Sequence, residues 1–181
     1  MKKMLNNKKG FTLVELLAVI VILALIMSIA IISMTGIMQG ARYSTMKETG
    51  LQIINGVRQQ LTLSNKLPSE AGDTKYYYFT ESLLDKGGKE SPLGGEFKYN
   101  DGESGTKIGY AGVYEASGAL TCGNTEANQQ SYVKVEGQGN GKSPIFSICL
   151  VTKNTGEYYI NEATEEELFK NDNDANGKIT K

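Results

Sequence analysis

Apolar residues fill one long stretch near the start of the chain without interruption. From Leu16 to Met34 every residue is Ala, Val, Ile, Leu or Met apart from two serines, and none is charged. These nineteen residues are about the length that a helix needs to cross a membrane core. Four lysines and no acidic residue lie within the first ten positions. This charge bias predicts a single-pass helix with its N-terminus in the cytoplasm and the rest of the chain outside.

A second, one-sided pattern follows the apolar run. Apolar residues then recur mostly at spacings of three, four or seven, at Ile37, Ala41, Leu51, Ile54, Val57 and Leu61. This is the stripe of an amphipathic helix. Because no proline occurs between Phe11 and Leu67, the two patterns predict one helix that continues to about Ser64.

Glycines interrupt the predicted helix at four places: Gly36, Gly40, Gly50 and Gly56. Each costs about 1 kcal/mol relative to alanine in a helix interior. Gly36 and Gly40 form a small-xxx-small-like pair that permits close approach of another helix, and simple close packing is the interpretation that we favour for them. Local melting of the helix near Gly36 and Gly40 is the alternative.

Short apolar runs and glycine-rich turns alternate over residues 66–181, which is typical of β-structure. Strands are predicted at 96–100, 107–114, 131–136, 145–151 and 156–160. Short helices are predicted at Thr80–Leu84 and at 164–170, where Thr164-x-x-Glu167 forms a capping box. The aromatic run Tyr76–Phe79 is assigned to core packing. An antiparallel sheet laid across the helix stripe gives an α+β fold.

Composition excludes several classes of chemistry. The chain has no histidine, which removes Ser-His and Cys-His nucleophile pairs and histidine-based metal sites. Its net charge of −1 argues against a broad nucleic-acid-binding surface. The segment Gly137–Ser143 ends like a phosphate loop, but Glu136 stands where that loop requires a glycine. We therefore predict a turn between strands there, and no enzyme activity.

Two cysteines, Cys122 and Cys149, lie in the part of the chain predicted to be outside the cytoplasm. An even pair in that environment is compatible with one disulfide. Such a bond would contribute roughly 3 kcal/mol by closing a loop in the unfolded chain. Two buried free thiols acting as small apolar side chains are the alternative.

Glu15 places a carboxylate inside the predicted membrane helix, where an ionisable group normally has a partner. Around it, Lys9-Gly10-Phe11-Thr12-Leu13-Val14-Glu15 and the following apolar residues resemble the class III signal of type IV pilins and secretion pseudopilins. The resemblance is to major pilins of Gram-positive, clostridial-type pili in particular. It implies that a prepilin peptidase cuts after Gly10 and N-methylates Phe11. It also implies that Glu15 pairs with the Phe11 ammonium of a neighbouring subunit, so that neither charge is buried alone.

The resemblance also implies a ladle fold, in which a long N-terminal helix spine packs against an antiparallel sheet head. Residues 1–10 would be the leader and 11–35 the transmembrane or filament-core half of the helix. Residues 36–181 would form the head, comprising the amphipathic half-helix (36–64), an αβ-loop (65–95), the sheet (96–160) and a C-terminal helix and tail (161–181). Loss of the leader removes four lysines, leaving 15 basic against 20 acidic residues.

By the same resemblance the chain is a structural subunit of a type IV pilus. It would be stored in the cytoplasmic membrane and then polymerised by an assembly platform and ATPase into surface filaments for adhesion, biofilm formation or twitching motility. The alternatives are a pseudopilin of a type II secretion or DNA-uptake machine, and a membrane-anchored binding module. A head of this size favours the pilus.

The C-terminal tail carries the one metal-like pattern. Asp172, Asp174 and Asn176, followed by Gly177, match the first positions of an EF-hand calcium loop. The chain stops before the position where a bidentate glutamate would complete the shell. A calcium site would therefore need oxygens from Glu165–Glu167 or from a neighbouring subunit. The alternative is a solvated, disordered tail.

Overall fold

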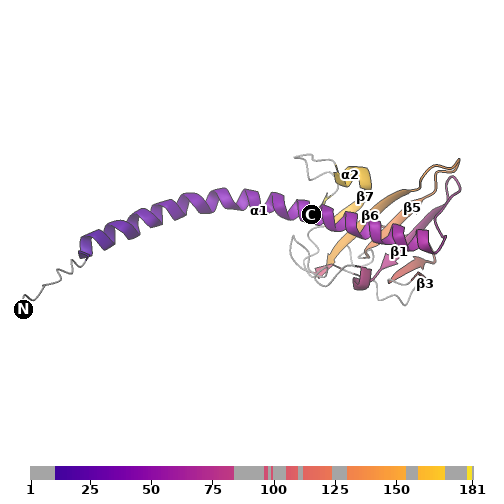
Figure 1. The fold of residues 1–181 in the computed structure, drawn as a ribbon, viewed down its shortest axis with the longest axis horizontal. Coiled ribbons are helices and arrows are strands. Elements are labelled where there is room, and N and C mark those ends of the chain that lie inside the picture. The colour runs from indigo at the N-terminus through magenta and orange to yellow at the C-terminus, as the bar shows by residue number, and fades with distance from the viewer. Residues whose placement is uncertain are drawn as a thin grey trace, which may run out of the picture. The chain divides into compact units, whose positions relative to one another are not determined.

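The structure, a computed structural model, describes residues 11–83, 96–97, 99, 105–109, 112–123, 130–153, 159–169 and 179–180. It divides into two compact units, Met1–Ala41 and Arg42–Lys181. Helix α1 (Leu13–Leu63) contributes residues to both units (Figure 1). The division falls within the segment 36–181 that the sequence assigned to the head.

Over Leu13–Ala30, α1 exposes its apolar side chains on every side. Leu13 is 79 % exposed, Leu25 62 % and Ile29 71 %. The stretch Leu13–Ala30 is long and apolar enough to cross a membrane, and none of it is buried within the protein. A helix that is apolar all round belongs in a non-aqueous environment. The described structure therefore agrees with the predicted single-pass helix.

In the second unit, α1 buries one face and exposes the other. Its fully buried residues are Met46, Ile53, Ile54, Val57 and Leu61. The stripe is thus real, but it begins later than the sequence predicted, because Ile37 is 74 % exposed. The helix ends at Leu63, close to the predicted Ser64. Asn65 (φ 50°) takes the left-handed conformation there, and the Lys66 N–H donates to the Leu61 carbonyl at 2.9 Å.

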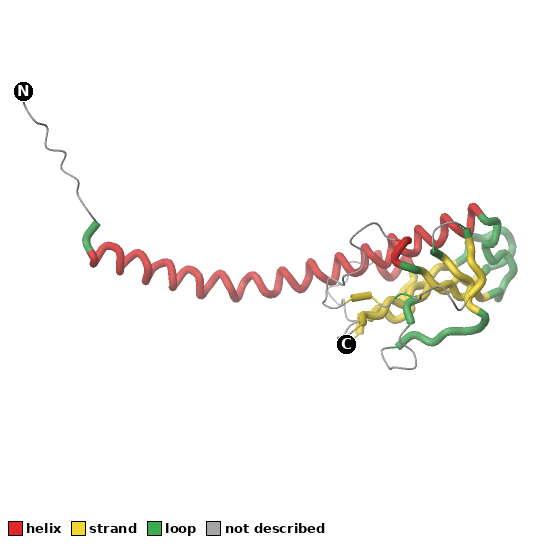
Figure 2. The backbone as a smooth tube through the Cα atoms, turned by 90° about the horizontal axis from the view of Figure 1, so that it is seen from below, coloured by secondary structure: helices red, strands yellow, loops and turns green. Residues whose placement is uncertain are grey.

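Eight described strands form the antiparallel sheet that lies along this part of α1 (Figure 2). They are β1 (Thr74–Phe79), β2 (Glu96–Phe97), β3 (Gly105–Ile108), β4 (Val113–Ala116), β5 (Tyr132–Glu136), β6 (Ile145–Lys153), β7 (Tyr159–Thr164) and β8 (Ile179–Thr180). Their order is β3-β4-β1-β5-β6-β7-β8, and β2 pairs with the last residues of β6. The α+β prediction is confirmed.

Several predicted element boundaries are wrong. The single strand predicted at 107–114 is the hairpin β3–β4, in which Gly109 (φ 64°) and Gly112 (φ 46°) adopt backbone conformations that reverse the chain. Strand β1 lies in the predicted αβ-loop 65–95. Strand β7 runs to Thr164 rather than 160, through a register shift against β6 and a positive φ at Glu162. Of the strand predicted at 96–100, Glu96–Phe97 form β2 and Tyr99 is not in a strand, while residues 98 and 100 lie outside the described residues.

The short helices and the predicted turn agree with the structure. Glu81–Leu83 forms a 3₁₀ turn, and α2 (Glu165–Phe169) follows Thr164. The capping box is present, since the Thr164 N–H donates to the Glu167 carboxylate at 2.8 Å and the Glu167 N–H to the Thr164 hydroxyl at 3.3 Å. Residues Gly137–Ser143 link β5 to β6, as predicted.

The inner face of the sheet packs on the stripe of α1. The core combines helix residues such as Ile54 with strand residues such as Tyr77, Phe79 and Ile148. A Cβ added at Gly50 would lie 3.3 Å from Ile160, and one added at Gly56 would lie 3.0 Å from Leu83. Gly50 and Gly56 therefore allow close packing of α1 against Ile160 and Leu83. A Cβ at Gly40 would meet nothing within 4 Å.

Arg58 links α1 to two other elements of the second unit, α2 and β6. Its guanidinium group makes two hydrogen bonds to the Glu165 carboxylate of α2, one of them of 3.2 Å between Nη1 and Oε1. The same group lies 4.5 Å from the ring centroid of Phe146 on β6. A bidentate pair of this kind fixes orientation as well as distance.

Truncation of the buried stripe tests this packing. We expect Ile54→Ala to lower the unfolding free energy of the second unit by about 2–5 kcal/mol, because Ile54 is fully buried. The exposed neighbour Gln59→Ala should change it by less than about 0.5 kcal/mol. All ten tyrosines lie in the second unit, so urea titration of the full chain in micelles, followed by tyrosine fluorescence, reports on this unit. Equal losses for the two variants would contradict the packing.

Candidate functional site

The start of α1 forms a closed hydrogen-bonded group. Glu15 Oε2 accepts hydrogen bonds from the Thr12 N–H and the Thr12 hydroxyl, both at 2.8 Å. The Glu15 N–H donates in return to the Thr12 hydroxyl at 3.3 Å. This reciprocal arrangement is a capping box, in which Thr12 is the N-cap and Glu15 the third helical residue. It satisfies backbone donors that the first turn of a helix leaves unpaired.

Thr12 is the residue that the sequence reasoning missed. The signal was available, because Thr12-x-x-Glu15 has the same spacing as Thr164-x-x-Glu167. The sequence-based interpretation considered only the charge of Glu15 in an apolar helix and its pairing with a neighbouring subunit. In the described chain this carboxylate has a local partner, before any partner from another subunit is considered.

Phe11, directly before the capping box, is 87 % exposed. Gly10, the other half of the predicted cleavage site, lies outside the described residues. This exposed phenylalanine is therefore accessible just before the N-terminal end of α1. Phe11 and Thr12 precede Leu13, the first residue of α1.

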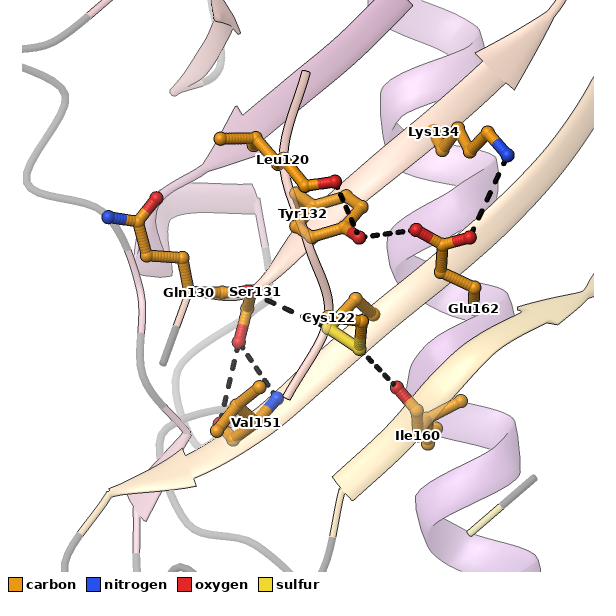
Figure 3. Close-up of a disulfide and its surroundings, with 10 residues drawn as sticks. Leu120, Cys122, Gln130, Ser131, Tyr132, Lys134, Val151, Ile160 and Glu162 are labelled. Atoms are coloured by element: carbon orange, nitrogen blue, oxygen red, sulfur yellow. Dashed lines mark hydrogen bonds and ion pairs between the residues drawn. A yellow bond between two sulfur atoms is a disulfide. The ribbon is translucent and has the colours of Figure 1, made fainter. Parts of the chain in front are cut away.

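The two predicted cysteines meet on the outer face of the sheet, the face away from α1. Cys122 and Cys149 form a disulfide with a Cα–Cα distance of 5.7 Å (Figure 3). Cys149 belongs to β6 and is fully buried, whereas Cys122 belongs to residues 117–123, which follow β4. We call this segment the strap. The disulfide therefore ties the strap to the centre of the sheet.

Aromatic residues fill the space beside the disulfide. The outer cluster contains Tyr78, Tyr132, Cys149 and Val151, with Tyr76, Tyr114, Ala116, Leu120 and Cys122 packed against it. The rings of Tyr76 and Tyr132 meet edge to face, with centroids 5.5 Å apart. The predicted core role of the run Tyr76–Phe79 is confirmed, but its members divide between the two faces of the sheet.

A polar network closes the edge of this cluster. Figure 3 shows the Tyr132 hydroxyl beside the Leu120 carbonyl oxygen of the strap and the Glu162 carboxylate of β7. Lys134 pairs with that carboxylate at 3.7 Å and with Glu136 at 2.8 Å. Burial and the hydrogen bond to Glu162 raise the pKa of Tyr132, and the hydrogen bond to Glu136 raises the pKa of Lys134. Tyr132 thus stays a neutral donor and Lys134 a cation at neutral pH.

Metal ligation has no support in the described residues. No group of three or more His, Cys, Asp or Glu side chains within them is arranged to hold an ion. The predicted calcium ligands Asp172, Asp174 and Asn176 lie outside the described residues. The two cysteines are bonded to each other and are not available as thiolate ligands.

Comparison with known proteins gives one family. A model of the prokaryotic N-terminal methylation motif matches residues 5–31. The match covers Gly10, Phe11, Thr12 and Glu15 together with most of the apolar run. No curated protein and no solved structure gives a match. The N-terminal part of the chain thus carries a prepilin-type methylation motif, which supports the class III signal, and this motif is a structural and not an enzymatic one.

Removal of the disulfide tests the role of the strap. We expect Cys122→Ala/Cys149→Ala to lower the unfolding free energy of the second unit by roughly 3 kcal/mol, because the bond closes a loop with a sequence separation of 27. The urea m-value should rise, since the unfolded chain becomes more expanded. Urea titration by tyrosine fluorescence measures both quantities, and wild type in reductant is the control. A loss below about 0.5 kcal/mol with an unchanged m-value would show that the strap needs no covalent tie.

Proposed function

We propose that the protein is a structural subunit, of the major type, of a type IV pilus. It is inserted in the cytoplasmic membrane as a single-pass prepilin with its N-terminus inside. Prepilin peptidase removes residues 1–10 and methylates Phe11, and an assembly platform with its ATPase moves the subunit into a helical homopolymer on the cell surface. Adhesion, biofilm formation and twitching motility are the roles that such a filament serves.

The observation that carries the proposal is the coincidence of two features on α1. The methylation motif spans residues 5–31, and the same stretch exposes an apolar surface that the described chain does not cover. A membrane can cover such a surface before assembly, and the helices of neighbouring subunits can cover it afterwards. One helix thereby serves storage in the membrane and polymerisation in turn.

Glu15 has a defined part in this change of environment. In the single chain its carboxylate accepts hydrogen bonds from Thr12, which compensates its position in an apolar helix. Cleavage after Gly10 would create a second group that needs a partner, the ammonium of Phe11. In a helix bundle the carboxylate of one subunit and the ammonium of the next form a pair that neutralises both charges. The pair would therefore set the axial register of the polymer.

A pseudopilin of a type II secretion or DNA-uptake machine is the second candidate, because its subunits carry the same methylation motif. The second unit favours the pilus. It spans Arg42–Lys181 and carries an antiparallel sheet of eight described strands with both faces covered. Such a head offers a large surface to the outside of a filament. A membrane-anchored binding module is less well supported, since the motif denotes a subunit that polymerises.

Two substitutions separate the charge of Glu15 from its capping role. Glu15→Gln retains a side chain that suits the third position of a capping box but removes the charge. Thr12→Ala removes the cap hydrogen bonds and keeps the charge. We expect Glu15→Gln to be inserted and cleaved but to reduce the yield of sheared filaments at least tenfold. Thr12→Ala should retain most of the yield.

Filament yield is measured by shearing cells of the native host and by electron microscopy, with membrane fractions as the control for expression. Normal filaments from Glu15→Gln would show that charge pairing is dispensable. Loss of filaments in Thr12→Ala alone would assign Glu15 a capping role only. Absence of surface filaments from the wild type, with the protein retained in a secretion complex, would favour the pseudopilin.

A further inference from the structure

A polar hollow lies on the second unit, beside the strap. Its volume is about 500 Å³, within the range typical of small-molecule sites. The start of β1, the end of β4, the first residues of the strap and strand β5 form its walls. These segments come from residues 73–76, 115–119 and 134–136, so the fold alone brings them together.

Charged side chains in the hollow are held in pairs. Lys75 Nζ lies 3.1 Å from Glu115 Oε1, and Lys134 Nζ lies 2.8 Å from Glu136 Oε1. Each of these four side chains keeps between 21 % and 41 % of its surface exposed, so none of the four is fully buried. With Asp73, the walls contain three carboxylates and two ammonium groups. Donors and acceptors therefore alternate in a space with little net charge.

The walls are fixed before any ligand arrives. Tyr76 lines the hollow, and its ring is held edge to face against Tyr132. Lys134 forms ion pairs with Glu136 and Glu162, and the Glu162 carboxylate accepts a hydrogen bond from the Tyr132 hydroxyl (Figure 3). The strap residues Ser117–Ala119 form another wall and lie close in sequence to the disulfide at Cys122. Preorganisation of this kind lowers the entropic cost of binding.

The chemistry of the walls selects among ligands. An anion would meet three carboxylates against two ammonium groups, and a cation would compete with the two lysines that already pair with Glu115 and Glu136. A neutral polyhydroxylated molecule matches better, because each hydroxyl group both donates and accepts hydrogen bonds. The amphipathic ring of Tyr76 offers an apolar surface to the C–H face of such a ligand. The small residues Gly118 and Ala119 leave room for close approach.

We propose that this hollow binds a neutral saccharide. The ligand hydroxyl groups bridge the Lys75–Glu115 and Lys134–Glu136 pairs, and Tyr76 contacts the sugar ring. A single subunit is sufficient, because every wall belongs to the second unit. The proposal is therefore independent of filament assembly, and the Glu15→Gln variant should bind the saccharide as well as wild type does.

The test uses the full chain in micelles of a sugar-free amine-oxide detergent, since maltoside detergents would occupy the hollow. The probes are the methyl glycosides of glucose, galactose, mannose and N-acetylglucosamine, followed by saturation-transfer NMR against empty micelles. Sodium phosphate, followed by ³¹P line broadening, is the charged comparison. We expect at least one glycoside to bind with a dissociation constant on the order of 1 mM, which is the affinity that common ligand efficiencies give a monosaccharide.

Gly118→Phe is the decisive variant. A Cβ at Gly118 meets nothing within 4 Å, so a side chain can start there without a clash, and Gly118 lines the hollow. Ser143→Phe is the matched control, because Ser143 is exposed on the β5–β6 turn and does not line the hollow. We expect Gly118→Phe to weaken binding at least tenfold, with unchanged unfolding in urea. Ser143→Phe should bind as wild type does.

Three results would overturn the proposal. They are the absence of glycoside signals above those of empty micelles, equal binding by wild type and Gly118→Phe, and binding of phosphate in preference to every glycoside. If Gly118→Phe also lost stability in urea, Lys75→Gln replaces it as the variant. Lys75 is more than a third exposed, and its loss should weaken binding without unfolding the second unit. Unchanged binding by Lys75→Gln would then count against the proposal.

Discussion

Burial of the apolar surface of α1 is the constraint on which the rest of the structure depends. Between Arg42 and Leu63 the protein meets this need itself, because residues such as Ile54, Val57 and Leu61 are covered by the sheet. Each side chain of this size gains about 1.5–3 kcal/mol from full burial. Between Leu13 and Ala30 the apolar surface is exposed on all sides, so its covering has to come from outside the described chain. The same helix is thus a core element at one end and, in the function proposed above, an assembly element at the other.

In the second unit, a helix covers only one face of the sheet, and the other face is covered in a different way. The inner face is covered by α1, and the outer face carries its own cluster of tyrosines beneath the disulfide-bonded strap. A single small core would leave a head of this kind marginally stable, so a covalent tie on the outer face, away from α1, is effective. The polar network around Tyr132 completes the edge of that cluster, and the hollow lies beside it. Covering the outer face has therefore also built a candidate binding surface.

The sequence predicted the features that depend on long, regular patterns. The helix could be predicted because its proline-free run and its periodic stripe extend over many turns, and its end because Asn65 and Pro68 follow. Strand β1 was missed because both faces of the sheet are covered at that strand. Its residues therefore read as consecutive aromatics rather than an alternating pattern. The β3–β4 hairpin was missed because its turn depends on the conformations of Gly109 and Gly112, which periodicity does not report.

The candidate sites also differ in how far the sequence alone predicts them. Gly10, Phe11 and Glu15 are recognisable because the class III signal is local in sequence, although the capping role of Thr12 was overlooked. The hollow could not be predicted, since its walls come from three separate segments that only the sheet register brings together.

The intact mass of the protein from its native host tests the central claim most directly. The account predicts a chain that begins at Phe11, with one added methyl group and two hydrogens fewer for the Cys122–Cys149 bond. Fragmentation should place the methyl group on the N-terminal nitrogen. A mass that retains residues 1–10, or a cleavage at any other position, would contradict the account of α1 as a processed assembly element.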